Sequence, residues 1–245
     1  MSTNIYETDK LLSEYLLFHY GSDAEILGER GSDPALSSAL GFAVRTTSRF
    51  TSGDAERGLD LGCAVGRSTF EMSRDCKEVI GIDFSASFIS AAETLRDGGT
   101  IRYARLEEAA VSTALVAQAP EGIDDSRISF ETGDAMNLRP DLGAFDRVHA
   151  ANLLCRLPEP QRLLNRLPEL VKPGGELVLA TPCTWLEEFT PPENWPSGGT
   201  FDWLKSELSQ AFDLLSQNDE RFVIRETARK FQFTFSLLTI WRRKG

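Results

Sequence analysis

From residue 58 onward, short apolar runs alternate with longer segments whose apolar residues recur at helical spacing. The apolar runs predict strands at 58–61, 78–82, 128–131, 145–150 and 176–181. The segments between them predict helices at 67–74, 86–96 and 160–170. Strands that alternate with helices at this pitch are typical of a parallel, doubly wound sheet.

The N-terminal part has a different pattern, which predicts helices and no strand. Residues 9–19 place apolar side chains at helical spacing, so we expect an amphipathic helix there. Asp33 and Pro34 have the residue types of an N-cap and a first helical position, and they predict a second helix that runs to about residue 50. We therefore expect residues 1–52 to form a helical cap on the sheet.

Two segments interrupt the alternation, and two strands close the chain. Residues 97–127 are too long for a simple connection and predict an insertion with structure of its own. Residues 183–200 read as a loop that carries two tryptophans, and we interpret it as a lid on the substrate side. Residues 222–226 and 231–241 predict two neighbouring strands. One domain spanning residues 1–245 is the simplest organisation.

Composition and charge narrow the classes of function. The 245 residues are 41% hydrophobic, which is enough for one well-cored domain. A formal net charge of −11 argues against a nucleic-acid partner, because phosphate backbones require clustered Lys and Arg. The polar start predicts no signal peptide, and no apolar run has the length of a membrane span. The four cysteines are scattered, with no C-x-x-C pair, so we expect reduced thiols in a cytoplasmic protein.

A glycine turn follows the first predicted strand. The segment 58–61 leads into Gly62 and Gly66 and then into a helix, an arrangement that forms the nucleotide crevice of open α/β sheets. Glycine at 62 permits a sharp turn, and glycine at 66 permits a close approach. The dinucleotide fingerprint would need glycine at positions 64 and 67, where Ala64 and Arg67 stand. The turn alone is therefore a weak signal.

Acidic residues at two later strand ends make the glycine turn informative about the ligand. Asp83 ends the second apolar strand, where a carboxylate can accept hydrogen bonds from both ribose hydroxyls. Asp134 follows the third strand, in a position to accept from an adenine amino group. Asn152 ends the fourth strand, and Gly174 and Gly175 form the turn before the fifth. In this order and spacing, the set is much more informative than any one of its parts.

The set resembles the class I S-adenosylmethionine methyltransferases over about residues 55–182 and the closing strands. The resemblance implies an α/β fold with a seven-stranded Rossmann-like sheet, mostly parallel with an antiparallel last strand. It implies that Asp60 lies near the methionine amino group, Asp83 on the ribose, and Asp134 by the adenine. Ala64 departs from the usual second glycine. The cofactor residues that we predict are Asp60, Gly62, Cys63, Ala64, Gly66, Asp83, Phe84, Ser85, Gly133, Asp134, Ala135, Met136 and Asn152.

The segment after the fourth strand bears on the methyl acceptor. Nucleic-acid amino methyltransferases carry Asn/Asp-Pro-Pro-Tyr/Phe there, whereas this chain has Ala-Ala-Asn-Leu-Leu-Cys-Arg at 150–156. Together with the net charge, this absence argues against DNA and RNA bases. Metal-dependent catechol enzymes need a cluster of acidic ligands, and none can be assembled from the sequence, so we predict no metal site. A small-molecule acceptor remains.

A narrower resemblance covers almost the whole chain. Segments 6–12, 14–21, 151–158, 184–191 and 229–232 are similar to the 4-mercaptohistidine (5-thiohistidine) N1-methyltransferase family of ovothiol biosynthesis. In many members this is the C-terminal domain of a protein that begins with an iron-dependent sulfoxide synthase. The resemblance implies methyl transfer to an imidazole nitrogen with release of S-adenosylhomocysteine. A separate sulfoxide synthase that supplies the substrate is a candidate partner.

An amino-acid acceptor of this kind would need charged and aromatic neighbours. Arg156 or Arg229 could bind its carboxylate through a guanidinium fork. Glu187 or Glu188 could hold its ammonium group or take the imidazole proton. The other substrate residues that we predict are Tyr15, His19, Tyr20, Asn152, Trp185 and Trp195. The aromatic residues of the N-terminal helix fit core packing equally well, and His19 fits a packing or capping role better than that of a base. Glu187 and Glu188 also fit a solvated pair.

Two other functions remain open at this point. The same fold accepts many acceptors, so the enzyme could methylate another small molecule. The chain could also be a non-catalytic S-adenosylmethionine-binding partner of a sulfoxide synthase. A product profile with mercaptohistidine, histidine and unrelated thiols separates these possibilities.

Overall fold

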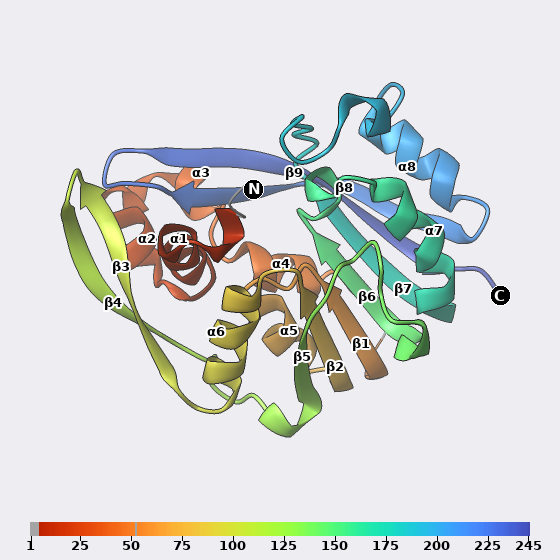
Figure 1. The fold of residues 1–245 in the computed structure, drawn as a ribbon, viewed down its shortest axis with the longest axis horizontal. Helices are drawn as coiled ribbons and strands as arrows, with labels where there is room; N and C mark the ends of the chain where they lie inside the picture. Colours follow the sequence, from red (N-terminus) through yellow and green to blue (C-terminus); the bar gives the residue numbers. More distant parts are fainter. Residues whose placement is uncertain (1–4, 52) are drawn as a thin grey trace.

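The computed structural model describes residues 5–51 and 53–245. A seven-stranded sheet in the order β5-β2-β1-β6-β7-β9-β8 forms the centre of the molecule (Figure 1). Its strands are β1 (Ala55–Leu61), β2 (Cys76–Asp83), β5 (Ile128–Thr132), β6 (Phe145–Ala151), β7 (Val171–Thr181), β8 (Phe212–Arg225) and β9 (Phe231–Arg243). Neighbouring strands from β5 to β7 are parallel, and β9 pairs antiparallel with both β7 and β8. The predicted fold class is confirmed.

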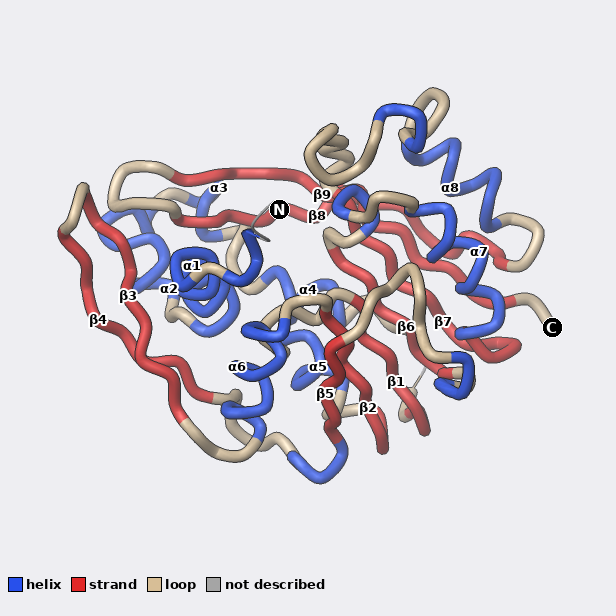
Figure 2. The backbone as a smooth tube through the Cα atoms, in the orientation of Figure 1, coloured by secondary structure: helices blue, strands red, loops and turns tan. Residues whose placement is uncertain are grey.

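Helices cover both faces of this sheet (Figure 2). The longer ones are α1 (Asp9–Tyr20), α6 (Ala86–Arg96), α7 (Pro160–Leu170) and α8 (Thr200–Leu208); the shorter ones are α2 (Asp23–Leu27), α3 (Pro34–Ser37), α4 (Phe42–Thr47) and α5 (Arg67–Met72). Six 3₁₀ turns complete the described chain: η1 (Ile5–Glu7), η2 (Gly28–Ser32), η3 (Asp125–Arg127), η4 (Pro140–Leu142), η5 (Leu154–Arg156) and η6 (Pro192–Asn194). In the described residues, no helix has the length and apolar character required to cross a membrane.

The core follows from alternation along the strands. Leu59 and Leu61 of β1 face the same side as Leu177 of β7, where they pack with leucines of α7 and α8. The opposite face packs against α4 and α5, and a second cluster joins α1, α2 and α6. Both faces of the parallel strands are therefore buried, which explains why these strands appear in the sequence as nearly continuous apolar runs.

The N-terminal cap differs from expectation in two places. Asp33 does cap a helix, since its carboxylate accepts from the backbone of Ala35 at 2.8 Å, but that helix ends after one turn. Gly41, at φ +66°, separates it from α4, so the predicted helix to residue 50 is two helices. The sequence analysis also missed α2, which begins with a capping box between Ser22 and Glu25.

The segment 97–127 holds an antiparallel hairpin of its own, formed by β3 (Thr100–Glu108) and β4 (Val111–Gln118). Tyr103 and Ala117 of this hairpin are buried in the cluster that contains α1 and α6. Glu107, which is partly exposed, pairs with the buried Arg225 at the end of β8 at 2.5 Å. Packing and charge thus hold the hairpin beside the N-terminal helices (Figure 1).

The close approach at Gly66 generates a stability prediction. Its φ is +91°, and an added Cβ would lie 2.8 Å from Phe130 and 3.0 Å from Ala92. We expect Gly66→Ala to destabilise the protein by about 2–4 kcal/mol, the sum of left-handed strain and overpacking. Gly98→Ala is the matched control, because Gly98 has φ +80° and no atom within 4 Å. It should cost only about 1 kcal/mol in urea unfolding. Equal losses for the two variants would contradict the packing argument.

Candidate active site

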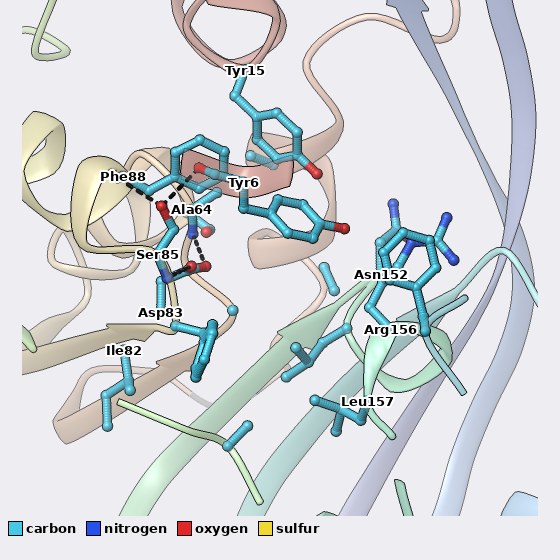
Figure 3. Close-up of a pocket in the computed structure, with 18 of the residues that line it drawn as sticks. Tyr6, Tyr15, Ala64, Ile82, Asp83, Ser85, Phe88, Asn152, Arg156 and Leu157 are labelled. Carbon is cyan, nitrogen blue, oxygen red and sulfur yellow. Dashed lines mark hydrogen bonds between the residues drawn. The ribbon is translucent and has the colours of Figure 1, made fainter. Parts of the chain in front are cut away.

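A cavity of about 540 Å³ lies where the parallel strands end (Figure 3). The ends of β1, β2, β5 and β6 form one part of its wall, and α1, α4 and β8 form another. A crevice at the carboxyl ends of strands is the usual ligand site of open α/β sheets, and this volume suits a ligand of cofactor size.

The glycine turn after β1 holds its shape through left-handed backbone. Gly62 and Gly66 have φ of +69° and +91°, and Ala64 between them has φ +49°. A left-handed alanine costs on the order of 1 kcal/mol. The amide of Ala64 donates to the Asp83 carboxylate at 2.9 Å, which fixes this conformation. Ala64 therefore keeps the turn that the family usually builds with glycine.

Asp60 lies behind the cavity wall and does not line it. Its carboxylate, 1% exposed, accepts from Ser68 Oγ at 2.6 Å and from Thr69 Oγ1 at 2.7 Å. A third hydrogen bond joins it to His149 Nδ1 at 2.8 Å. Burial works to raise the pKa of Asp60, but these hydrogen bonds outweigh it and hold the pKa below its usual value. The contact of Asp60 with a methionine amino group stays a prediction; its neighbours Gly62 and Ser68 do line the cavity.

The sequence analysis missed His149. It lines the cavity from β6, and its Nε2 lies 3.0 Å from Thr46 Oγ1 of α4. The signal that could have identified His149 is the strand register, because His149 stands directly opposite Asp60 in the pairing of β1 with β6. A histidine inside a predicted buried strand next to a buried aspartate indicates such a pair.

Asp83 ends β2 and faces the cavity. One carboxylate oxygen accepts from Ala64 and the other from the amide of Ser85 at 2.9 Å. Burial raises the pKa of Asp83 above its usual value, against these backbone hydrogen bonds. Each oxygen keeps acceptor capacity, so the pair could accept from two vicinal hydroxyls. Phe84, 66% exposed, lies beside it and offers an apolar ring to the cavity.

The turn after β5 supplies the second carboxylate. Asp134 accepts from the amide of Met136 at 2.8 Å through one oxygen, and both residues line the cavity. Ile82 and Ala135 add apolar surface between Asp83 and Asp134. The Asp83 carboxylate can accept from the hydroxyl groups of a ribose, and the Asp134 carboxylate can accept from a purine amino group. Together with the apolar surface, these two carboxylates fit the ribose and purine of S-adenosylmethionine. Of the other predicted cofactor residues, Cys63 is fully buried, and neither Cys63 nor Gly66 lines the cavity.

Five of the predicted acceptor residues line the same cavity; they are Tyr15, His19, Asn152, Arg156 and Glu188. Asn152 has φ +56°, and its side-chain oxygen accepts from Ser236 at 2.7 Å. Arg156 donates to the carbonyl of Thr184 at 3.1 Å and lies 4.7 Å from the ring of Phe189. Glu188 is exposed.

The other five predicted residues lie outside this cavity. Tyr20 donates to the carbonyl of Val65 at 2.6 Å, behind the glycine turn. Trp185 donates to Thr200 at 3.0 Å, and Trp195 donates to the carbonyl of Thr190 at 2.7 Å. Glu187 is exposed, and Arg229 is exposed in the turn between β8 and β9. Each tryptophan therefore uses its indole nitrogen for a hydrogen bond within residues 183–200.

The N-terminal turn η1 adds two residues that the site prediction omitted. Tyr6 lines the cavity, and its ring meets those of Tyr15 and Phe88 edge-on at 6.4 and 6.0 Å. Glu7 accepts from the first amides of α6, Ala86 at 2.9 Å and Ser87 at 3.2 Å. Figure 3 shows the ring of Tyr6 between Asp83 and Arg156, with the ring of Tyr15 above it. Burial raises the pKa of Tyr6, and the neighbouring Arg156 opposes this.

No group of three or more His, Cys, Asp or Glu side chains that could hold a metal ion occurs in the residues that the structure describes.

Comparisons with known proteins agree with this geometry. Residues 59–177 match the family model described as a methyltransferase domain. Methyltransferase GfsG of Streptomyces halstedii is 25% identical over 122 residues, which are 50% of this chain and 36% of GfsG. Demethylmenaquinone methyltransferase of Lactiplantibacillus plantarum is 26% identical over 192 residues, 76% of this chain and 68% of that protein. The chain thus spans well under half the length of GfsG.

Among solved structures, the N-methyltransferase NodS of Bradyrhizobium japonicum in complex with S-adenosylhomocysteine has the same fold. The TM-score is 0.56 at 16% identity, and the match covers 96% of this chain and 99% of NodS. The sheet order, the carboxylates that end β2 and follow β5, and the match over residues 59–177 agree with one another. Residues 59–177 are thus similar to a methyltransferase domain, the fold is that of methyltransferases such as NodS, and the cofactor that these similarities support is S-adenosylmethionine.

Proposed function

We propose that this protein transfers a methyl group from S-adenosylmethionine to an imidazole nitrogen of 4-mercaptohistidine, releasing S-adenosylhomocysteine, as in ovothiol biosynthesis. One observation carries the proposal. Three segments that resemble the mercaptohistidine methyltransferases, 6–21, 151–158 and 184–191, are far apart in the sequence and converge on the cavity beside Asp83. Convergence on one site supports a shared acceptor rather than a shared scaffold.

The cavity offers complementary groups for such an amino acid. Arg156 is held by the Thr184 carbonyl and the Phe189 ring, so its guanidinium is already oriented toward a carboxylate. Glu188 is the carboxylate placed to meet an ammonium group or to take the imidazole proton. The rings of Tyr6 and Tyr15 add apolar surface to the cavity wall.

Methyl transfer from a sulfonium to a ring nitrogen requires little from the protein beyond this arrangement. The cofactor supplies a methyl group on a sulfonium, and the acceptor nitrogen supplies a lone pair. The side chains that line the cavity then have to hold the acceptor ring in line and keep competing water out. We extend the proposal to a cytoplasmic enzyme, consistent with four free cysteines, and to a separate sulfoxide synthase as the source of substrate.

A direct assay tests the proposal. Purified protein is incubated with S-adenosylmethionine and mercaptohistidine, and both the methylated product and S-adenosylhomocysteine are measured by mass spectrometry. We expect turnover with mercaptohistidine, and much less with histidine or with thiols that lack an imidazole. Turnover only with a different small acceptor would assign another methyltransferase activity. Cofactor binding without any turnover would favour a non-catalytic partner.

The geometry at the end of β2 generates a cofactor prediction. We expect Asp83→Asn to weaken S-adenosylhomocysteine binding by about 10- to 100-fold, because charge-assisted hydrogen bonds contribute about 1.5–3 kcal/mol. Isothermal titration calorimetry measures this. Asp125→Asn is the control, since Asp125 is exposed at the start of η3 and lies outside the cavity. The prediction is refuted by an unchanged dissociation constant in a variant that melts at the temperature of the parent.

The two neighbouring glutamates give a matched pair of substitutions. Glu188 lines the cavity, whereas Glu187 does not. If Glu188 pairs with the ammonium group, Glu188→Gln should lower kcat/KM for mercaptohistidine by about two- to fivefold, since exposed ion pairs contribute about 0.2–1 kcal/mol. Glu187→Gln should leave kcat/KM unchanged. A loss of more than 100-fold in kcat for Glu188→Gln would instead identify it as the base.

A further inference from the structure

The cavity has an acceptor wall that carries no carboxylate, guanidinium or ammonium group. We name it the α1–β8 wall; it consists of Phe18, His19, Phe42, Phe222 and Ile224. The rings of Phe42 and Phe222 lie 5.1 Å apart, and that of Phe18 lies 6.3 and 6.1 Å from them. Tilted and edge-on rings of this kind offer apolar surface to flat, apolar ligands. The charged groups Arg156 and Glu188 belong to other parts of the cavity wall, on η5 and the lid loop.

His19 is the polar member of this wall, and its buried Nδ1 atom has no hydrogen-bond partner among residues 5–51 and 53–245. The ring stacks on Tyr15 at 5.9 Å and meets Phe18 edge-on at 5.0 Å. A buried imidazole nitrogen without a partner carries a desolvation cost that phenylalanine would avoid. A bound molecule with a ring nitrogen would supply the missing partner.

The other histidine of the chain cannot play this part. His149 also lines the cavity, but both of its ring nitrogens are engaged, one with Asp60 at 2.8 Å and the other with Thr46 at 3.0 Å. Two imidazoles therefore border one cavity, and only that of His19 is available to a ligand.

The surroundings of His19 keep its ring uncharged at neutral pH. Burial, together with the nearby charge of Arg67 of α5, lowers the pKa of His19 to about 3, while Asp60 acts in the opposite direction. Tyr15 and Tyr20 flank it on α1, and burial raises the pKa of both, so neither adds a charge. A neutral imidazole has one donor and one acceptor nitrogen. A group with this pKa is a poor proton acceptor near pH 7.

We infer that His19 is a specificity residue, which exchanges a hydrogen bond with a ring nitrogen of a planar heteroaromatic acceptor laid against the α1–β8 wall. The inference rests on the proposed function, because it concerns the acceptor part of the same cavity. It extends that function by assigning recognition of the heterocyclic ring to His19 and the α1–β8 wall, separate from recognition of charge at Arg156 and Glu188.

The test compares two flat probes on protein saturated with S-adenosylhomocysteine. Ligand-observed NMR measures the binding of 4-methylimidazole and of 3-methylthiophene, which has a similar shape and no ring nitrogen, at a pH where 4-methylimidazole is neutral. We expect the parent protein to prefer 4-methylimidazole at least tenfold. His19→Phe, which keeps a flat ring, should reduce this preference to within about twofold. Its S-adenosylhomocysteine affinity should remain that of the parent.

Two further readouts separate recognition from structure. The melting temperature of ligand-free His19→Phe should equal or exceed that of the parent, because an unpaired buried nitrogen is removed. With mercaptohistidine, His19→Phe should raise KM at least tenfold and leave the pH dependence of kcat unchanged. If the pH profile of kcat loses one of its limbs in His19→Phe, His19 acts as a base and the inference is overturned.

Failure of the inference and failure of the proposed function give different results. If mercaptohistidine is methylated but the probe preference survives in His19→Phe, His19 does not recognise the ring, and the proposed function stands. If mercaptohistidine is not methylated but the preference depends on His19, the specificity inference stands and the acceptor is another nitrogen heterocycle. A parent protein without any preference between the probes overturns the inference directly.

Discussion

A carboxylate buried at the centre of a sheet has to be fully paired, and the pairing of Asp60 organises this active site. Its donors come from α5 and from β6, and His149 continues the chain of contacts to Thr46 in α4. The turn between Asp60 and Ser68 is therefore fixed at both ends. With its ends fixed, Ala64 is held in left-handed backbone and its amide is directed at Asp83, so one buried charge sets the geometry of the cofactor end.

The two halves of the cavity depend on different kinds of constraint. Backbone conformation and strand ends shape the cofactor half, where Asp83 and Asp134 each accept from a nearby amide. The acceptor half is assembled from α1, α4, β8, η5 and the lid loop, which are distant in sequence. Only tertiary packing brings these elements together. This difference explains how a common cofactor site can coexist with acceptor sites of many chemistries.

The same difference decides what could be predicted from the sequence. Buried strands and the spacing of Asp60, Asp83 and Asp134 predicted the sheet and its class, because these signals are local. The start of β8 at Phe212 was missed, since its polar residues alternate on an edge that solvent reaches. Tyr20 and Trp195 have the residue types of a binding wall, but their polar atoms bond to backbone carbonyls. The direction of a side chain depends on contacts that residue type does not encode.

The N-terminal turn η1 links the two halves physically. Glu7 accepts from the first amides of α6, and the Tyr6 carbonyl accepts from Ser85 at 3.0 Å, so the turn is anchored beside Asp83. The ring of Tyr6 also lies 6.3 Å from that of Phe189, which stacks under Arg156. Through Tyr6 and Glu7, this one short segment therefore contacts both the start of α6 beside Asp83 and the aromatic ring that lies against Arg156.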